Sequence, residues 1–327
     1  MAAGNKPSSD QPDGGIHASS LMRAAAGVAA VRNLSVASKG KRLLMFTSGT
    51  RGDVQPLVAL GASLQAAGFV LRVLTNVNHV EFMRGFGLDA VGTSPDSEKW
   101  FKEDSVMLKC MADGNFLEFT KGLAAKAKEA FPKQLEAQWR QARDFKPDLV
   151  LSSALEATQA VAIAGVMGIP VVQCGLTALF PSGDDQSLME EPAWLPRWCH
   201  RVAWQLVSAL WFQSERDGKH ATLLQQLPGC EPYLVRNAAQ CLLLERTEPT
   251  LVGVSPTVAK KSLEWPEQVA LTGFWIVDKG EQQQRMLRGD SMFGGGSDCD
   301  KVSGFMLRGA RPVYVGWGSM VSVSAEH

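Results

Sequence analysis

The chain has 327 residues, 45% hydrophobic and 20% charged, values typical of a globular protein of about two domains. Lys plus Arg and Asp plus Glu number 33 each, so the net charge of zero gives no electrostatic reason to expect a nucleic-acid partner. No window approaches the roughly 20 apolar residues that a spanning helix needs, so we expect any membrane contact to be peripheral.

The N-terminal stretch is rich in Ala, Ser and Gly and holds no acidic residue after Asp13. We predict that residues 1–40 form a disordered tail before the first strand. A transit peptide has a similar Ser- and Arg-rich composition, but Asp10 and Asp13 break its acid-poor pattern. The transit peptide is therefore the weaker alternative.

From residue 41 onward, short apolar runs alternate with amphipathic stretches, a pattern that predicts βαβ units around a parallel sheet. The first predicted elements are strand 43–47, helix 54–67, strand 70–75, a short helix 80–85 and strand 88–91. The next are an amphipathic helix 116–145 broken or kinked near Pro132, strand 149–152, helix 156–167 ended by Gly168, and strand 169–173. The sequence therefore predicts an α/β fold, a Rossmann-like parallel sheet with flanking helices.

A stretch with turn residues and little periodicity, 175–196, is predicted to be a long loop at the strand ends, and loops of that length are usually functional. A tryptophan-rich helix follows it. Trp204 and Trp211 are seven residues apart and should share a face of that helix. Core packing is the plainer interpretation of this face, and an apolar acceptor pocket or a membrane-surface face is the functional one.

The last third of the chain predicts strands at 241–244, 269–275 and 312–316. Residues 282–302 are polar and glycine-rich and are expected to be exposed. The domains we predict are a first domain at 41–278, a linker or insertion at 279–310, and the start of a second domain at 311–327. The sequence stops within seven residues of its last turn, so we expect that second domain to be incomplete.

The six cysteines are scattered along the chain without a C-x-x-C pair or a nearby histidine at metal-ligand spacing. The sequence therefore predicts no metal site. A reduced, cytoplasmic compartment, with possible contact to membrane surfaces, is the simplest interpretation of this cysteine usage.

One turn carries residues suited to chemistry: the run GTRGDVQP over 49–56 joins the first predicted strand to the first predicted helix. Open α/β sheets bind ligands at such turns. Its glycines permit a sharp turn and a close approach to a ligand, and Pro56 suits the first turn of a helix. The carboxylate of Asp53 either caps the helix or acts as a general base.

This run resembles the first loop of GT-B glycosyltransferases of family 28, closest to the sterol 3-beta-glucosyltransferases. The resemblance extends from about residue 41 to 320 and is weak in the middle third. Its matching segments are GTRGDVQPLVALGASLQAAGF at 49–69, PDLV at 147–150, GIP at 168–170, TGFW at 272–275 and RPVYVGWGSM at 311–320. It implies two Rossmann-like domains facing across a cleft, with the acceptor held mainly by the first and a nucleotide sugar mainly by the second.

The resemblance also implies roles for particular residues in an inverting transfer of a hexose from a UDP-sugar to the hydroxyl of a sterol or similar lipid. Asp53 matches the candidate general base. The other implied positions are Gly49, Thr50, Arg51, Gly318 and Ser319 for the donor, and Thr177, Leu179, Phe180 and Trp204 for the acceptor. Arg51 could equally be a structural ion-pair partner. The UDP-sugar is a co-substrate, and no cofactor is expected.

The chain also departs from the family pattern. Asn76 stands where the family usually has histidine and His79 where it has phenylalanine, so we expect a surface or helix-capping role for His79. The His-Gly-Gly-x-Gly and Asp-Gln-Pro segments that bind the donor in the family are missing. We therefore expect this chain to be the acceptor half and inactive alone. The alternatives are a glycosyltransferase for a polyketide or peptide aglycone, and a non-catalytic lipid-binding remnant.

Overall fold

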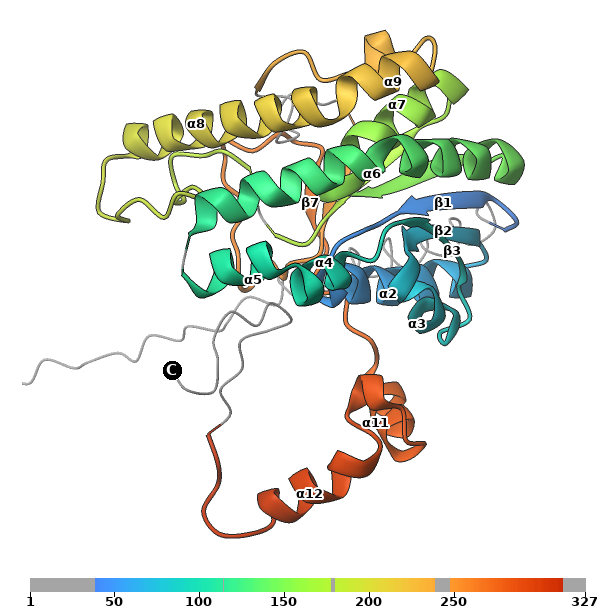
Figure 1. The fold of residues 1–327 in the computed structure, drawn as a ribbon, viewed down its shortest axis with the longest axis vertical. Helices are drawn as coiled ribbons and strands as arrows, with labels where there is room; N and C mark the ends of the chain where they lie inside the picture. Colours follow the sequence, from blue (N-terminus) through green and yellow to red (C-terminus); the bar gives the residue numbers. More distant parts are fainter. Residues whose placement is uncertain (1–38, 114, 178–179, 239–247, 314–327) are drawn as a thin grey trace, which may run out of the picture.

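The core of the molecule is a seven-stranded parallel sheet with strand order β3-β2-β1-β4-β5-β6-β7 (Figure 1). The computed structural model describes residues 39–113, 115–177, 180–238 and 248–313. The strands are β1 Arg42–Phe46, β2 Val70–Asn76, β3 Asp89–Ser94, β4 Leu149–Ser153, β5 Val171–Gly175, β6 Thr250–Val252 and β7 Val269–Leu271. This sheet confirms the predicted Rossmann-like α/β fold.

Helices cover both faces of the sheet (Figure 1). The helices α2 (Arg51–Ala66) and α3 (Val80–Arg84) lie on one face, and α6 (Phe116–Phe145) and α7 (Ala157–Met167) on the other. In β1, Leu43 and Met45 belong to the apolar cluster under α2, whereas the alternate residues Leu44 and Phe46 belong to the cluster under α6 and α7. Because helices cover both faces of the sheet, the sequence of β1 is a continuous run of apolar residues rather than an alternating one.

Helix α6 runs unbroken through Pro132, so the break that the sequence allowed there is absent. Proline removes one intrahelical hydrogen bond and leaves the carbonyl four residues earlier without its donor. That residue, Lys128, is exposed, so water can hydrate its carbonyl at little cost. The predicted end of α7 is confirmed: Gly168 adopts the left-handed conformation, with φ 68°.

The remaining elements include the predicted tryptophan-rich helix, α8, and others, such as strand β6, that the sequence did not indicate. Strand β6 is three residues long and pairs with β5 on one side and β7 on the other. The predicted strand 269–275 ends early, at Leu271. The further helices are α4 Ser97–Glu103, α5 Ser105–Ala112, α8 Arg197–Glu215, α9 Ala221–Gln226, α11 Lys279–Leu287 and α12 Ser297–Met306, with short 3₁₀ turns η1 Val77–His79, η2 Ala154–Glu156, η4 Glu231–Tyr233 and η5 Ser291–Phe293 and a π-helical turn Arg216–His220.

The segment predicted to be a linker or insertion, 279–310, contains α11, η5 and α12. The carboxylates of Asp278 and Asp290 cap α11 and η5, and Arg285 of α11 donates to the carbonyl of Gly85 and lies 3.7 Å from the Phe86 ring centroid. This part of the segment therefore packs against the end of α3.

Several predicted features fall where the structure gives no description. Residues 1–38 of the predicted tail, strand 241–244, and residues 314–327 of the second domain lie outside the described residues. Within the described part of the chain, no helix combines the length and the apolar character needed to cross a membrane.

Candidate active site

The turn between β1 and α2 places Asp53 in the first turn of the helix, at the carboxyl end of a central strand. Oδ2 of Asp53 accepts hydrogen bonds from the backbone N–H of Thr50, at 2.7 Å, and from the Thr50 hydroxyl, at 3.0 Å. This is the capping arrangement, so the structural role of Asp53 is observed directly. A role as general base stays a prediction.

The position of this turn suits ligand binding, because the strand order reverses between β1 and β4 and open α/β sheets bind ligands at that reversal. Asp53 is half-buried. Both hydrogen bonds from Thr50 end on Oδ2, and among the described residues no side chain or N–H donates to Oδ1. Oδ1 can therefore accept a proton or a hydrogen bond from a bound molecule.

The absence of a side chain at Gly49 leaves room for the Asp53 carboxylate beside it. The φ of Gly49 is +120°, and a Cβ at this position would come within 2.4 Å of Asp53 Oδ2. The backbone therefore approaches the carboxylate as closely as only glycine allows. Close approach of a ligand to Gly49 stays a prediction.

Arg51 is held by aromatic rings rather than by a direct ion pair among the described residues. Its Nε donates to Gln55 Oε1 at 2.9 Å, and its guanidinium lies 5.3 Å from the Phe82 ring centroid and 5.2 Å from that of Phe293. Burial lowers the pKa of the Arg51 guanidinium, while the charges of Asp290 and Glu98 oppose that shift. The side chain stays cationic.

An open cavity of about 530 Å³ lies beside Arg51. Its lining consists of Arg51, Gly52, Gln55, Pro56, Trp275, Ile276 and Val277. Two segments that carry the family resemblance, 49–69 and 272–275, thus meet at one cavity although they lie more than 200 residues apart. The sequence did not indicate this meeting: β7 is the edge strand farthest from β1 on that side, and the segment after it reaches the β1–α2 turn only in the folded chain.

The candidate acceptor residues do not line one shared pocket. Phe180 is buried in the cluster at the β6–β7 end of the sheet, with its ring centroid 5.1 Å from that of Trp265. Trp204 is buried against Val207 and donates from Nε1 to the carbonyl of Asp185 at 3.3 Å. Thr177 is exposed on the bend after β5. Leu179, Gly318 and Ser319 lie outside the described residues.

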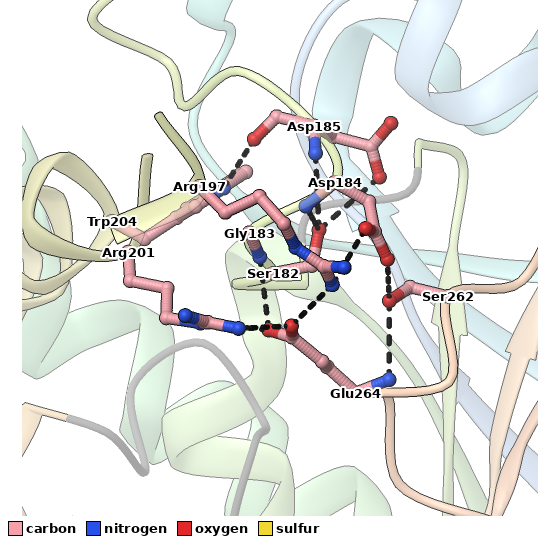
Figure 2. Close-up of polar contacts among 9 residues, drawn as sticks. All are labelled: Ser182, Gly183, Asp184, Asp185, Arg197, Arg201, Trp204, Ser262 and Glu264. Atoms are coloured by element: carbon pink, nitrogen blue, oxygen red, sulfur yellow. Dashed lines mark hydrogen bonds and ion pairs between the residues drawn. The ribbon is translucent and has the colours of Figure 1, made fainter. Parts of the chain in front are cut away.

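The loop after β5 is pinned by a polar network (Figure 2). Glu264 is its centre: it accepts from the backbone N–H of Gly183 at 2.9 Å and pairs with Arg197, at 2.7 Å, and with Arg201. Asp184 joins the network from the loop, accepting from the Ser262 hydroxyl at 2.6 Å. The network therefore ties three segments together: the loop, the start of α8 and the turn before β7.

Replacing Glu264 by glutamine is expected to loosen this loop. Hydrogen bonding from Arg201 holds the pKa of Glu264 at about 2, below the roughly 4.3 of an unpaired glutamate. The stabilisation is therefore complete above about pH 4.3 and is lost as the pH falls toward 2. We expect Glu264→Gln to lower Tm by about 2–4 °C at pH 7, and the difference from wild type to vanish near pH 2.

The check is thermal unfolding of both proteins between pH 2 and 7, with Glu267→Gln as the matched control, since Glu267 is a neighbouring exposed glutamate. The control should follow wild type at every pH. A Glu264→Gln difference that stays constant with pH would contradict the role assigned to its carboxylate.

The prediction for His79 is wrong. Its side chain is 1% exposed and caps no helix; instead Nε2 lies 3.1 Å from the carbonyl oxygen of Gly49. Asn76 is also buried and accepts from the Gly49 N–H at 2.9 Å. Both residues thus contact the turn that carries Asp53. The only sequence signal was their departure from the family pattern, which gave no partner.

Metal binding finds no support in the part of the chain that the structure describes. No group of three or more His, Cys, Asp or Glu side chains there could hold a metal ion. Burial raises the pKa of the Cys174 thiol to about 12, so this thiol stays protonated at neutral pH.

No protein-family model matches the chain. Its sequence is nevertheless similar to those of several known proteins. Over 304 residues, 87% of the chain, it is 25% identical to the sterol 3-beta-glucosyltransferase of Cryptococcus neoformans var. neoformans serotype D. The chain is similar to sterol 3-beta-glucosyltransferases. Those of Yarrowia lipolytica and Candida albicans are 24% and 22% identical over 85% and 88% of the chain. These findings confirm the resemblance that the sequence motifs indicated.

The sterol 3-beta-glucosyltransferases are much longer than this chain, which spans 17% of the Cryptococcus protein and 18% of the other two. Among solved structures, CalG4, the calicheamicin glycosyltransferase, gives a TM-score of 0.45 at 17% identity, covering 72% of this chain and 52% of that one. The glycotransferase of kitacinnamycin gives 0.45 at 21%, covering 75% and 54%. At these TM-scores the two structures add nothing to the fold that the strand order already shows.

Proposed function

We propose that this chain is the acceptor-binding half of an inverting glycosyltransferase that moves a hexose from a UDP-sugar to the hydroxyl of a sterol or similar lipid. The observation that carries the proposal is the Asp53 turn at the reversal of strand order, within a chain similar over 87% of its length to sterol 3-beta-glucosyltransferases. In this proposal transfer also needs a donor half, which binds the UDP-sugar.

The chemistry assigned to the turn follows from its two carboxylate oxygens. A sterol hydroxyl has a pKa far above neutral, so a base must take its proton as the oxygen attacks the anomeric carbon. Asp53 Oδ2 is held by Thr50, while Oδ1 remains to accept that proton. Attack from the face opposite the departing diphosphate inverts the anomeric carbon in a single displacement.

The donor side of the proposal rests on the cavity beside Arg51. Its volume of about 530 Å³ lies within the 300–1,000 Å³ of ordinary ligand pockets. A guanidinium that lies beside two aromatic rings and donates to Gln55 is a positioned cation for the charge of a diphosphate. Gly49 and Thr50 stay candidates on the same turn, and Gly318 and Ser319 stay candidates for the opposite domain.

The test is sugar transfer by a longer protein that contains this chain and the donor half, supplied with UDP-glucose and ergosterol. We expect a sterol β-glucoside. Transfer to a polyketide or peptide aglycone but not to a sterol would replace the acceptor class. Binding of a fluorescent sterol without any transfer would favour the non-catalytic lipid-binding alternative.

Peripheral membrane contact is the second part of the proposal, and a cytoplasmic location beside membranes goes with it. Helix α8 lies along the outer edge of the molecule (Figure 1). Every fourth residue on its outer side is apolar and 45% to 70% exposed: Trp198, Val202, Leu206 and Leu210. Residues 192–214 also contain no acidic side chain, which favours an anionic or neutral lipid surface.

Sedimentation with phosphatidylcholine vesicles that contain ergosterol checks this contact. Burying one large apolar side chain contributes about 1.5–3 kcal/mol, so Trp198→Ala combined with Leu210→Ala should lower partitioning by at least tenfold. Val258→Ala, also exposed but on another surface, is the control. Equal partitioning of all three proteins would remove α8 from the proposal.

A further inference from the structure

Both backbone polar groups of Gly49 are bound by side chains, one from the last residue of β2 and one from the η1 turn that follows it. Asn76 Oδ1 accepts from the Gly49 N–H at 2.9 Å, and His79 Nε2 lies 3.1 Å from the Gly49 carbonyl oxygen. Asn76 also donates from Nδ2 to the carbonyl of Pro95 at 2.6 Å. With both ends of its amide occupied and only 3% of its surface exposed, Asn76 cannot turn away without leaving buried polar groups unpaired.

The protonation of His79 follows from the same contact. A carbonyl oxygen only accepts hydrogen bonds, so the 3.1 Å contact with Gly49 assigns a proton to Nε2, and the longer 3.5 Å approach of Asn78 Nδ2 to the same nitrogen is then not a hydrogen bond. The ring is 1% exposed, and water therefore cannot substitute for this donor. A phenylalanine of similar size could fill the space but could not make the bond.

The position of Gly49 in turn fixes that of Asp53. Asp53 Oδ2 occupies the space where a Cβ of residue 49 would lie, 2.4 Å from that point. The next N–H along the chain, that of Thr50, donates to the same oxygen at 2.7 Å. A rotation of the peptide between Gly49 and Thr50, whose carbonyl contacts His79, would therefore move both the surface on which the carboxylate rests and the donor that holds it.

We propose that Asn76 and His79 are positioning residues, which clamp the backbone on both sides of the Gly49 Cα and thereby aim the free oxygen of Asp53 at the acceptor hydroxyl. This inference deepens the proposed function and rests on it. The two side chains come from 27 and 30 residues farther along the chain. The clamp therefore couples the end of β2 to the turn after β1.

The clamp itself is tested on the 327-residue chain without any activity assay. In wild type, ¹⁵N NMR of His79 should show a protonated Nε2, and an unprotonated Nε2 at neutral pH overturns the clamp. His79→Phe should raise amide exchange at Gly49 and Thr50 by about tenfold. His79→Gln, whose amide can still donate, should restore protection. Equal protection in a folded His79→Phe overturns the clamp, and if that variant does not fold, the tautomer measurement still decides.

The consequence for Asp53 is tested by steady-state kinetics in the longer protein. His79→Phe should lower kcat by about tenfold or more with KM for both substrates within about twofold, and His79→Gln should recover most of kcat. Faster amide exchange with an unchanged kcat would overturn the positioning role. If the wild-type longer protein transfers no sugar, the proposed function fails, whereas the NMR result still decides whether the clamp exists.

Discussion

Asp53→Asn in the longer protein is expected to lower kcat by about a hundredfold or more, the range typical of a lost general base. An asparagine oxygen can still accept from the Thr50 N–H, which Asp53 Oδ2 does now at 2.7 Å, so the helix cap and the fold should survive. The amide cannot take up a proton at neutral pH. Initial rates at saturating substrate, with circular dichroism to verify folding, measure the effect.

The matched control for this prediction is Asp96→Asn. Asp96 also caps a helix, accepting from the backbone N–H of Lys99 at 3.1 Å, and it lies just after β3 at the same edge of the sheet. Its kcat should stay within about twofold of wild type, since it is not placed at the reacting hydroxyl. If Asp53→Asn also kept more than a tenth of wild-type turnover, the base would have to be another residue.

Gly49→Ala is expected to destabilise the fold by about 2 kcal/mol or more. A side chain at φ +120° is strained, at about 1–3 kcal/mol for such a conformation. Its Cβ would also meet Asp53 Oδ2 at 2.4 Å, so the carboxylate must move. Urea unfolding measures the loss of stability, and turnover of the longer protein should fall with it.

Gly52→Ala, in the same turn, separates this effect from the general consequence of replacing a glycine. A Cβ at Gly52 meets only the Thr50 hydroxyl oxygen, at 3.6 Å, and its φ is not positive. Alanine there should be neutral or stabilise the protein by up to about 1 kcal/mol, because it restricts the unfolded chain. Equal losses for the two variants would show that the close approach at Gly49 is not what requires glycine.

The first five strands were predictable because their signals are local. Apolar runs such as 43–46 and 149–151 are buried on both faces, and each is followed by a turn residue or a cap. β6 was missed because three residues give no periodicity, and because it is held by pairing with β5 and β7, which lie far from it in the sequence or are themselves short. The long α6 was predicted, but its continuity through Pro132 depended on an exposed carbonyl that periodicity cannot reveal.

At the site, local sequence patterns predicted the turn between β1 and α2 but not the distant residues that contact it. The sequence predicted that 49–56 joins a strand to a helix and placed Asp53 beside the start of that helix at residue 54, since capping involves groups within four residues of each other. In the structure α2 begins earlier, at Arg51, and Asp53 lies in its first turn. The sequence did not determine the partners of that turn. Its interpretation of His79 as a surface or capping residue was wrong for this reason.

The sequence by itself therefore determined the fold class, the turn that carries Asp53 and the similarity to sterol 3-beta-glucosyltransferases. Only the tertiary structure decided that Asn76 and His79 hold Gly49, that Trp275 borders the cavity beside Arg51, and that Glu264 pins the loop after β5. The physical reason is that helix caps and burial periodicity arise between near neighbours in the chain. Contacts across 27 to more than 200 residues exist only once the strands have taken their order in the sheet.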